Sequence, residues 1–118
     1  MENKHSIIFV LVIFSIVFSL VFSVAAQEKK IVLGTSIITY EHPFYIDVVN
    51  GMTNAAEKAG VEMLLDDPKA KLDAQVKALE TYIARGVDAI VLFGVDPEGV
   101  VPVVEEAVAK GIPVITAD

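Results

Sequence analysis

Hydrophobic and polar positions follow two different periods along the chain. Mostly apolar, β-branched runs occur four times, at 30–36, 61–65, 87–93 and 113–117. Between them, apolar residues recur every three or four positions, which is the period of a helix with one buried face. The pattern therefore predicts four strands that alternate with three helices, beginning with a strand.

The predicted helices have recognisable starts. The first spans 44–59 and follows Pro43, because proline is tolerated in a first helical turn. The second and third follow the pairs Asp67–Pro68 and Asp96–Pro97, in which the aspartate is expected to cap the helix and the proline to occupy its first turn. Asp66, which needs no role in this scheme, is expected to be solvated.

Each predicted helix is followed by a glycine, at Gly60, Gly86 and Gly111. A glycine in this place allows the left-handed backbone that turns the chain into the next strand. Strands that are apolar nearly throughout are typical of a parallel sheet covered on both faces. We therefore predict an α/β fold of three layers with a parallel sheet. Its loops after the strands should line one edge, where ligands of open α/β sheets bind.

The first 26 residues differ in composition from the rest. Residues 7–24 carry no charge, Lys4 precedes them, and Ala25 and Ala26 are small residues of the kind that signal peptidases cut after. This order is that of a secretory signal peptide. The apolar run is also long enough to approach a membrane span, so a retained anchor is the alternative. In both cases residues 27–118 form one exported domain.

Composition and charge exclude several kinds of function. The chain has 16 acidic and 9 basic residues, a net charge of −7 and no cysteine. Scattered bases on an acidic chain argue against nucleic acid as a partner, and the lack of cysteine excludes disulfides and thiolate chemistry. His42 is the one histidine outside the leader, and Gly34–Ser36 lacks the spacing of a phosphate-binding loop. We therefore predict no enzymatic activity, no cofactor and no metal site.

Aromatic and polar side chains gather in the long loop after the first strand. These residues are Ser36, Thr39, Tyr40, Glu41, His42, Phe44 and Tyr45. Aromatic rings pack against the C–H faces of a sugar, whose hydroxyls need hydrogen-bonding partners. Asp118, at the end of the fourth strand, adds a carboxylate that can accept two hydroxyls at the same edge. In the alternative interpretation, Phe44 and Tyr45 are core residues of the first helical turn, His42 only starts the helix, and Asp118 is simply a chain end.

The succession of these segments resembles the ribose- and galactose-type periplasmic sugar-binding proteins, the type I substrate-binding proteins of ABC transporters. The resemblance rests on the leader, the strand 31–36, the block 72–93 and the closing segment 110–118, and it covers residues 30–118. The resemblance also includes residues 42–45, at the end of the loop after the first strand.

The resemblance implies roles for individual residues. Phe44 would stack on the sugar ring, Tyr45 would touch it, and Asp118 would hold its hydroxyls. His42 stands where these proteins usually have Asn or Asp as a ligand contact, and Ser36 is a looser match. The predicted ligand-binding residues are therefore Ser36, His42, Phe44, Tyr45 and Asp118.

The family has two lobes that close on the sugar about a hinge. The resemblance thus implies that 27–118 is an incomplete amino-terminal lobe whose second lobe is absent, and that this chain by itself binds sugar weakly or not at all. The expected function is that of a periplasmic or extracytoplasmic solute-binding protein for uptake or chemoreception. Its ligand would be a monosaccharide or related polyol, and its partner an ABC permease or membrane receptor. The alternative is a membrane-anchored or kinase-coupled sensor of a carbohydrate-like signal.

Overall fold

Strands and helices alternate through residues 29–117 of the computed structural model, which also describes residues 3, 5, 7 and 8. The elements are β1 (Val32–Ser36), α2 (Pro43–Ala59), β2 (Glu62–Asp66), α3 (Leu72–Arg85), β3 (Ala89–Leu92), α4 (Val101–Ala109) and β4 (Val114–Thr116). The four predicted strands and three predicted helices are confirmed. Asp118 and most of the predicted signal peptide lie outside the described residues.

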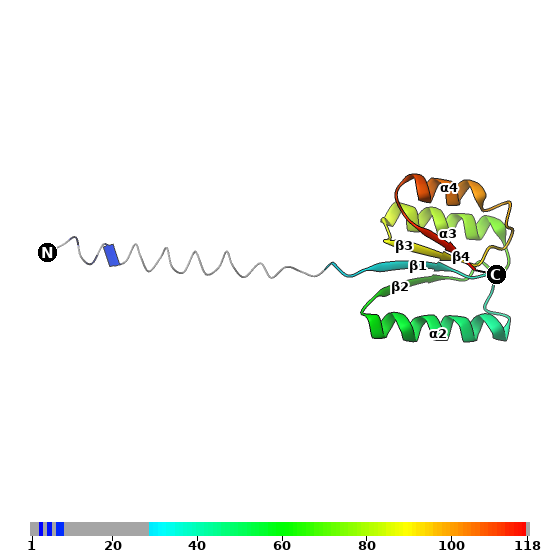
Figure 1. Ribbon diagram of the computed structural model, residues 1–118, viewed down its shortest axis with the longest axis horizontal. Helices are drawn as coiled ribbons and strands as arrows, with labels where there is room; N and C mark the ends of the chain where they lie inside the picture. The colour runs from blue at the N-terminus through cyan, green and yellow to red at the C-terminus, as the bar shows by residue number, and fades with distance from the viewer. Residues whose placement is uncertain (1–2, 4, 6, 9–28, 118) are drawn as a thin grey trace.

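The strands form one parallel sheet in the order β2-β1-β3-β4. Helices α3 and α4 cover one face and α2 covers the other, so the predicted three layers are confirmed (Figure 1). The last residue of β1, Ser36, is in register with Asp66 of β2 and Leu92 of β3, and Leu92 is in register with Thr116 of β4. The carboxyl ends of all four strands therefore meet at one edge of the sheet.

Each face of the sheet has its own apolar core. The larger core lies beneath α3 and α4 and includes Leu79, Ile90 and Leu92, each at most 2% exposed. The smaller core includes Val49 of α2 together with Ile37 and Phe93, which directly follow β1 and β3. The smaller core thus extends to the carboxyl edge, where the apolar residues that leave the strands meet the start of α2.

The helix ends match the sequence pattern better than the helix starts. Gly60 and Gly86 follow α2 and α3 with φ angles of 69° and 64°, in the predicted left-handed conformation. Asp67, however, does not cap α3, so that prediction was wrong. Lys69 and Ala70, with φ angles of 53° and 56°, insert a turn before the helix begins at Leu72.

Asp96 also caps a turn and not the helix itself. Its Oδ1 accepts hydrogen bonds from the N–H groups of Glu98 and Gly99, at 3.0 and 3.1 Å. The chain then continues through this turn, and α4 begins only at Val101. The third helix therefore starts later than the Asp96–Pro97 pair predicted.

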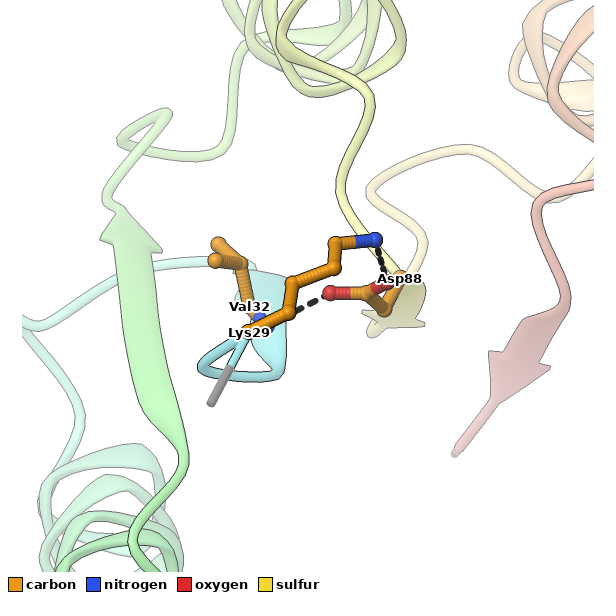
Figure 2. A network of polar contacts seen from close by, with 3 residues as sticks. All are labelled: Lys29, Val32 and Asp88. Carbon is orange, nitrogen blue, oxygen red and sulfur yellow. Dashed lines mark hydrogen bonds and ion pairs between the residues drawn. The ribbon is translucent and has the colours of Figure 1, made fainter. Parts of the chain in front are cut away.

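Asp88, at the amino edge of the sheet, binds the backbone at the beginning of β1. One carboxylate oxygen of Asp88, just before β3, accepts from the Val32 N–H at 2.9 Å, and the other pairs with the Lys29 Nζ at 2.9 Å (Figure 2). The hydrogen bond from Val32 and the neighbouring ammonium group hold the pKa of Asp88 below its usual value. This contact joins β1 to β3 at the edge opposite the predicted ligand site.

Removal of this carboxylate should produce a pH-dependent loss of stability. Because the folded state lowers the pKa of Asp88, its contribution is present above the unfolded pKa of about 4 and is lost as the pH falls through the folded value. We expect Asp88→Ala to lower the melting temperature at pH 7 and the difference from wild type to shrink towards pH 3. Glu106→Gln, which removes an exposed ion pair with Lys110, is the control and should have little effect at any pH. A constant difference across this range would contradict the role of the ionised Asp88.

Candidate functional site

Backbone hydrogen bonds join the loops at the carboxyl edge. The Phe93 N–H donates to the Ser36 carbonyl at 2.9 Å, and the Ala117 N–H donates to the Leu92 carbonyl at 2.9 Å. The loop after β1 is joined to the loop after β2, because the Ala70 N–H donates to the Ile38 carbonyl at 2.8 Å. These bonds connect the exits of the strands into one continuous rim.

Three aromatic rings are stacked edge-on at this rim, and we call Phe44, Tyr45 and Phe93 the aromatic cluster. The Tyr45 and Phe93 centroids are 5.9 Å apart at 83°, and those of Phe44 and Tyr45 are 5.2 Å apart at 78°. Such edge-to-face pairs are favourable arrangements of aromatic rings. Phe93 is 6% exposed, Tyr45 is half-buried, and Phe44 is 52% exposed. Tyr45 therefore packs partly into the core, as the alternative interpretation expected. The Phe44 ring is exposed to solvent and packs against the ring of Tyr45.

His42 occupies the N-cap position of α2. Its Nδ1 accepts a hydrogen bond from the Phe44 N–H at 3.2 Å, so the helix-start role considered for it is confirmed. An acceptor Nδ1 places the proton of the neutral imidazole on Nε2. Because the side chain is exposed, this Nε2–H is available as a donor, and the imidazole lies edge-on to the Tyr45 ring with the centroids 6.3 Å apart. One residue can thus both begin the helix and offer a hydrogen bond to a ligand.

Ser36 lies beneath the rim and not on its surface. It is fully buried, its Oγ donates to Asp66 Oδ2 at 2.9 Å, and the same oxygen accepts from Gln75 Nε2 at 3.1 Å. Asp66, which was expected to be solvated, is partly buried, because strand register places it against Ser36. Burial raises the pKa of Asp66, the nearby charge of Asp67 raises it further, and the Ser36 hydrogen bond opposes the rise.

Asp67 reaches across to the loop after β1. Its Oδ1 accepts from the Tyr40 N–H at 3.2 Å and from the Lys69 N–H at 3.1 Å. The carboxylate that the sequence assigned to a helix start instead holds the loop that precedes His42. Tyr40 is partly buried in the smaller core, so it helps to shape this loop from the inside.

Gln75 of α3 is the residue that sequence reasoning missed. It is fully buried, and its amide contacts both the loop after β1 and the loop after β3. The signal for it was a glutamine three residues after Leu72 and four before Leu79, on the apolar face of its helix. A buried amide requires hydrogen-bond partners, so its position on that face already pointed to a polar contact beneath the rim.

A hollow of about 310 Å³ opens at the carboxyl ends of β3 and β4. It is lined by Leu92, Gly94, Pro97, Val100, Thr116 and Ala117. A mostly apolar lining of this kind is typical of small-molecule sites. Ala117 in this lining is followed in the sequence by Asp118, which lies outside the described residues, so its predicted part in binding stays a prediction.

Metal-ligand clusters and membrane-spanning helices are both absent among the described residues. Within 29–117 and the few described leader residues, no three histidine, cysteine or acidic side chains gather in a way that could hold a metal ion. Over the same residues, no helix is both long and apolar enough to cross a membrane.

The chain is similar to several characterised sugar-binding proteins. It is 30% identical over 94 residues to the ribose import binding protein of Bacillus subtilis and 33% identical over 93 residues to the galactofuranose-binding protein of Escherichia coli. These alignments cover 80% and 79% of this chain. The chain spans only 31% and 29% of the length of these relatives.

A solved structure gives the same result in three dimensions. The arabinose-binding component of an ABC transporter from Shewanella, solved with L-arabinofuranose, superposes with a TM-score of 0.70 at 31% identity. The match covers 74% of this chain and 29% of that one. The similarity thus covers most of this chain but less than a third of the longer protein.

A family model described as a periplasmic binding protein domain matches residues 33–118, nearly the whole of the described fold. This family comprises substrate-binding proteins of ABC transporters and not enzymes. The resemblance inferred from the sequence is therefore confirmed, and the chain belongs to the periplasmic binding protein family.

Proposed function

We propose that this chain supplies the amino-terminal half of the sugar site of an exported solute-binding protein that serves an ABC importer. Its ligand is a monosaccharide or a related polyol. The single observation that carries the proposal is the ring of Phe44, which is 52% exposed at the carboxyl edge and supported from behind by Tyr45. An exposed aromatic ring that is held in place by a neighbouring ring can stack against the apolar face of a sugar.

Polar groups of the predicted site suit the hydroxyls of the same ligand. The Nε2–H of His42 offers a donor, and the Asp118 carboxylate is proposed as an acceptor at the end of β4. Tyr45 is proposed to contact the ligand with the part of its ring that stays exposed. Ser36 enters the proposal as a support beneath the rim, because its hydroxyl is buried and bonded to Asp66.

The similarity to proteins named for ribose, galactofuranose and arabinofuranose supports a pentose or a hexose as the ligand. The experiment is a screen of pentoses and hexoses against the protein purified from the cells that make it, followed by titration calorimetry. Saturable binding of at least one sugar is expected. If the purified protein has the mass of a two-lobed protein and none of these sugars binds at millimolar concentration, the proposal is wrong.

The intact mass of the purified protein tests the leader and the second lobe together. A signal peptide cleaved after Ala26 gives a chain that begins at Gln27, whereas a retained anchor leaves Met1 or Glu2 at the amino terminus. A mass about three times that of this chain identifies a two-lobed protein of the length of its relatives. A mass that matches 27–118 alone indicates a single lobe, for which weak sugar binding or none is expected.

Uptake and sensing differ in the partner that the protein needs. The uptake proposal rests on the relatives, which include a ribose import binding protein and the binding component of an arabinose ABC transporter. Loss of sugar accumulation on deletion of the gene supports uptake. If accumulation is unchanged and the protein stays in the membrane fraction, the anchored sensor becomes the better proposal.

A further inference from the structure

The amide of Gln75 joins two loops of the rim from beneath. Its Nε2 donates to the Phe93 carbonyl at 2.9 Å and to the Ile37 carbonyl at 3.3 Å, and its Oε1 accepts from the Val95 N–H at 2.7 Å. The same Nε2 also donates to Ser36 Oγ at 3.1 Å, so the amide takes part in four contacts. A side chain that is 0% exposed and this fully bonded fixes the groups that it touches.

The contacts on the loop after β3 flank a glycine. The Phe93 carbonyl and the Val95 N–H lie on either side of Gly94, and both are bonded to the same amide. The Phe93 ring packs edge-on against Tyr45, which in turn supports Phe44. The backbone that Gln75 holds is therefore the backbone that carries the base of the aromatic cluster.

Gln75 also contacts the loop after β1, through its hydrogen bond to the Ile37 carbonyl. Ile37 is the first residue after β1, is 0% exposed and belongs to the smaller core with Phe93 and Val49 of α2. The Gln75 amide thus sets the spacing between the loop that leads to His42 and the loop that carries Phe93. No other side-chain hydrogen bond between described residues joins these two loops.

From these contacts we infer that Gln75 is a positioning residue for sugar binding: it touches no ligand but holds the two loops so that the aromatic cluster keeps its geometry. The inference rests on the proposed function, because the cluster is proposed to meet the sugar. It predicts that loss of the amide loosens the rim locally and weakens sugar binding, beyond what a general loss of stability would do.

The test is Gln75→Met, which keeps the length of the side chain but removes every hydrogen bond of the amide. Amide hydrogen exchange is measured at Val95, which depends on Gln75, and at Ile90, whose N–H donates to the Pro113 carbonyl at 2.9 Å within the sheet. The ratio of the two rates separates local opening from global unfolding. Leu79→Ala, one turn along α3 and in the larger core, is the control for global destabilisation.

We expect Gln75→Met to raise the Val95 to Ile90 exchange ratio by about tenfold or more and to weaken sugar binding by a similar factor, since an unpaired buried group costs this much. Leu79→Ala should not raise this ratio, because global destabilisation speeds exchange at Ile90 at least as much as at Val95. It should change the affinity of the folded protein by no more than about twofold. An unchanged ratio in Gln75→Met overturns the inference. So does a raised ratio with an affinity equal to that of the control.

Failure of the proposed function would be seen separately. In that case the wild-type protein binds no sugar, whatever the exchange ratio of the variant.

A second variant covers the possibility that Gln75→Met does not fold. Gln75→Glu keeps the shape and the acceptor for Val95 but, when ionised, has no donor for the two carbonyls. Acidification protonates the introduced carboxyl and returns one donor, so its affinity should recover towards that of wild type as the pH falls. Asp66, which is linked to this position through Ser36, titrates in both proteins, so the two are compared at each pH. If the affinities stay in a constant ratio at every pH, the inference is overturned.

Discussion

Gly34→Ala is expected to destabilise the chain by about 2–4 kcal/mol, because overpacking a core and displacing hydrogen bonds both cost free energy. A Cβ at this position of β1 would lie 2.7 and 2.8 Å from two ring carbons of Tyr82. The ring cannot retreat freely, because the Tyr82 hydroxyl donates to the Thr35 carbonyl at 3.0 Å and to the Leu64 carbonyl at 3.3 Å. Chemical denaturation of the wild type and the variant measures the loss.

Two further variants make this prediction specific. Gly51→Ala, inside α2 with nothing within 4 Å of the added methyl group, should be neutral or stabilising by up to about 1 kcal/mol. Tyr82→Leu removes the ring, so Gly34→Ala should cost much less in that background than in the wild type. If Gly34→Ala costs the same in both backgrounds, its effect does not come from the clash with Tyr82.

Phe44→Ala is expected to weaken sugar binding by about 1–3 kcal/mol, or about 5- to 150-fold, through the loss of ring contact. The same change should alter stability by less than about 1 kcal/mol, because the ring is half-exposed in the absence of ligand. Titration calorimetry on the protein as its cells make it gives the affinity, and thermal unfolding gives the stability.

Ile46→Ala is the matched control for this substitution. Ile46 is 40% exposed on the same helix, but residues two apart on a helix do not face the same way. Its removal should therefore leave the affinity unchanged, and Phe44→Tyr, which retains the ring, should keep most of it. Equal affinities for wild type and Phe44→Ala would remove Phe44 from the site.

The sequence was sufficient for the elements of the fold but not for every boundary. The apolar period of α3 and the glycines after α2 and α3 are local signals, so they predicted where the helices lie and end. The starts failed at Asp67 and Asp96, since an aspartate caps a turn as readily as a helix. That Lys69 and Ala70 take positive φ angles depends on the tertiary bond from Ala70 to Ile38, which no local pattern reveals.

For the candidate site, too, local sequence signals predicted some residues, whereas tertiary contacts decided the position of others. His42, Phe44 and Tyr45 were predicted together because they follow one strand and begin one helix. The contact of Ser36 with Asp66 depends on the register of β1 against β2, and that of Gln75 with Phe93 depends on how α3 lies on the sheet. Such pairings join residues distant in sequence, so Ser36 was placed on the surface of the rim when it lies beneath it.

The central claim is that the carboxyl edge of this sheet binds a sugar, and chemical-shift mapping tests it most directly. Backbone amides of isotope-labelled protein, in the form that its own cells make, are followed while the sugar found by the screen is added. The account predicts saturable shifts at Phe44 and Tyr45, in the loop 93–97 and at Ala117, with none at Asp88 on the opposite edge. Shifts confined to other parts of the protein, or no shifts at saturating sugar, would contradict it.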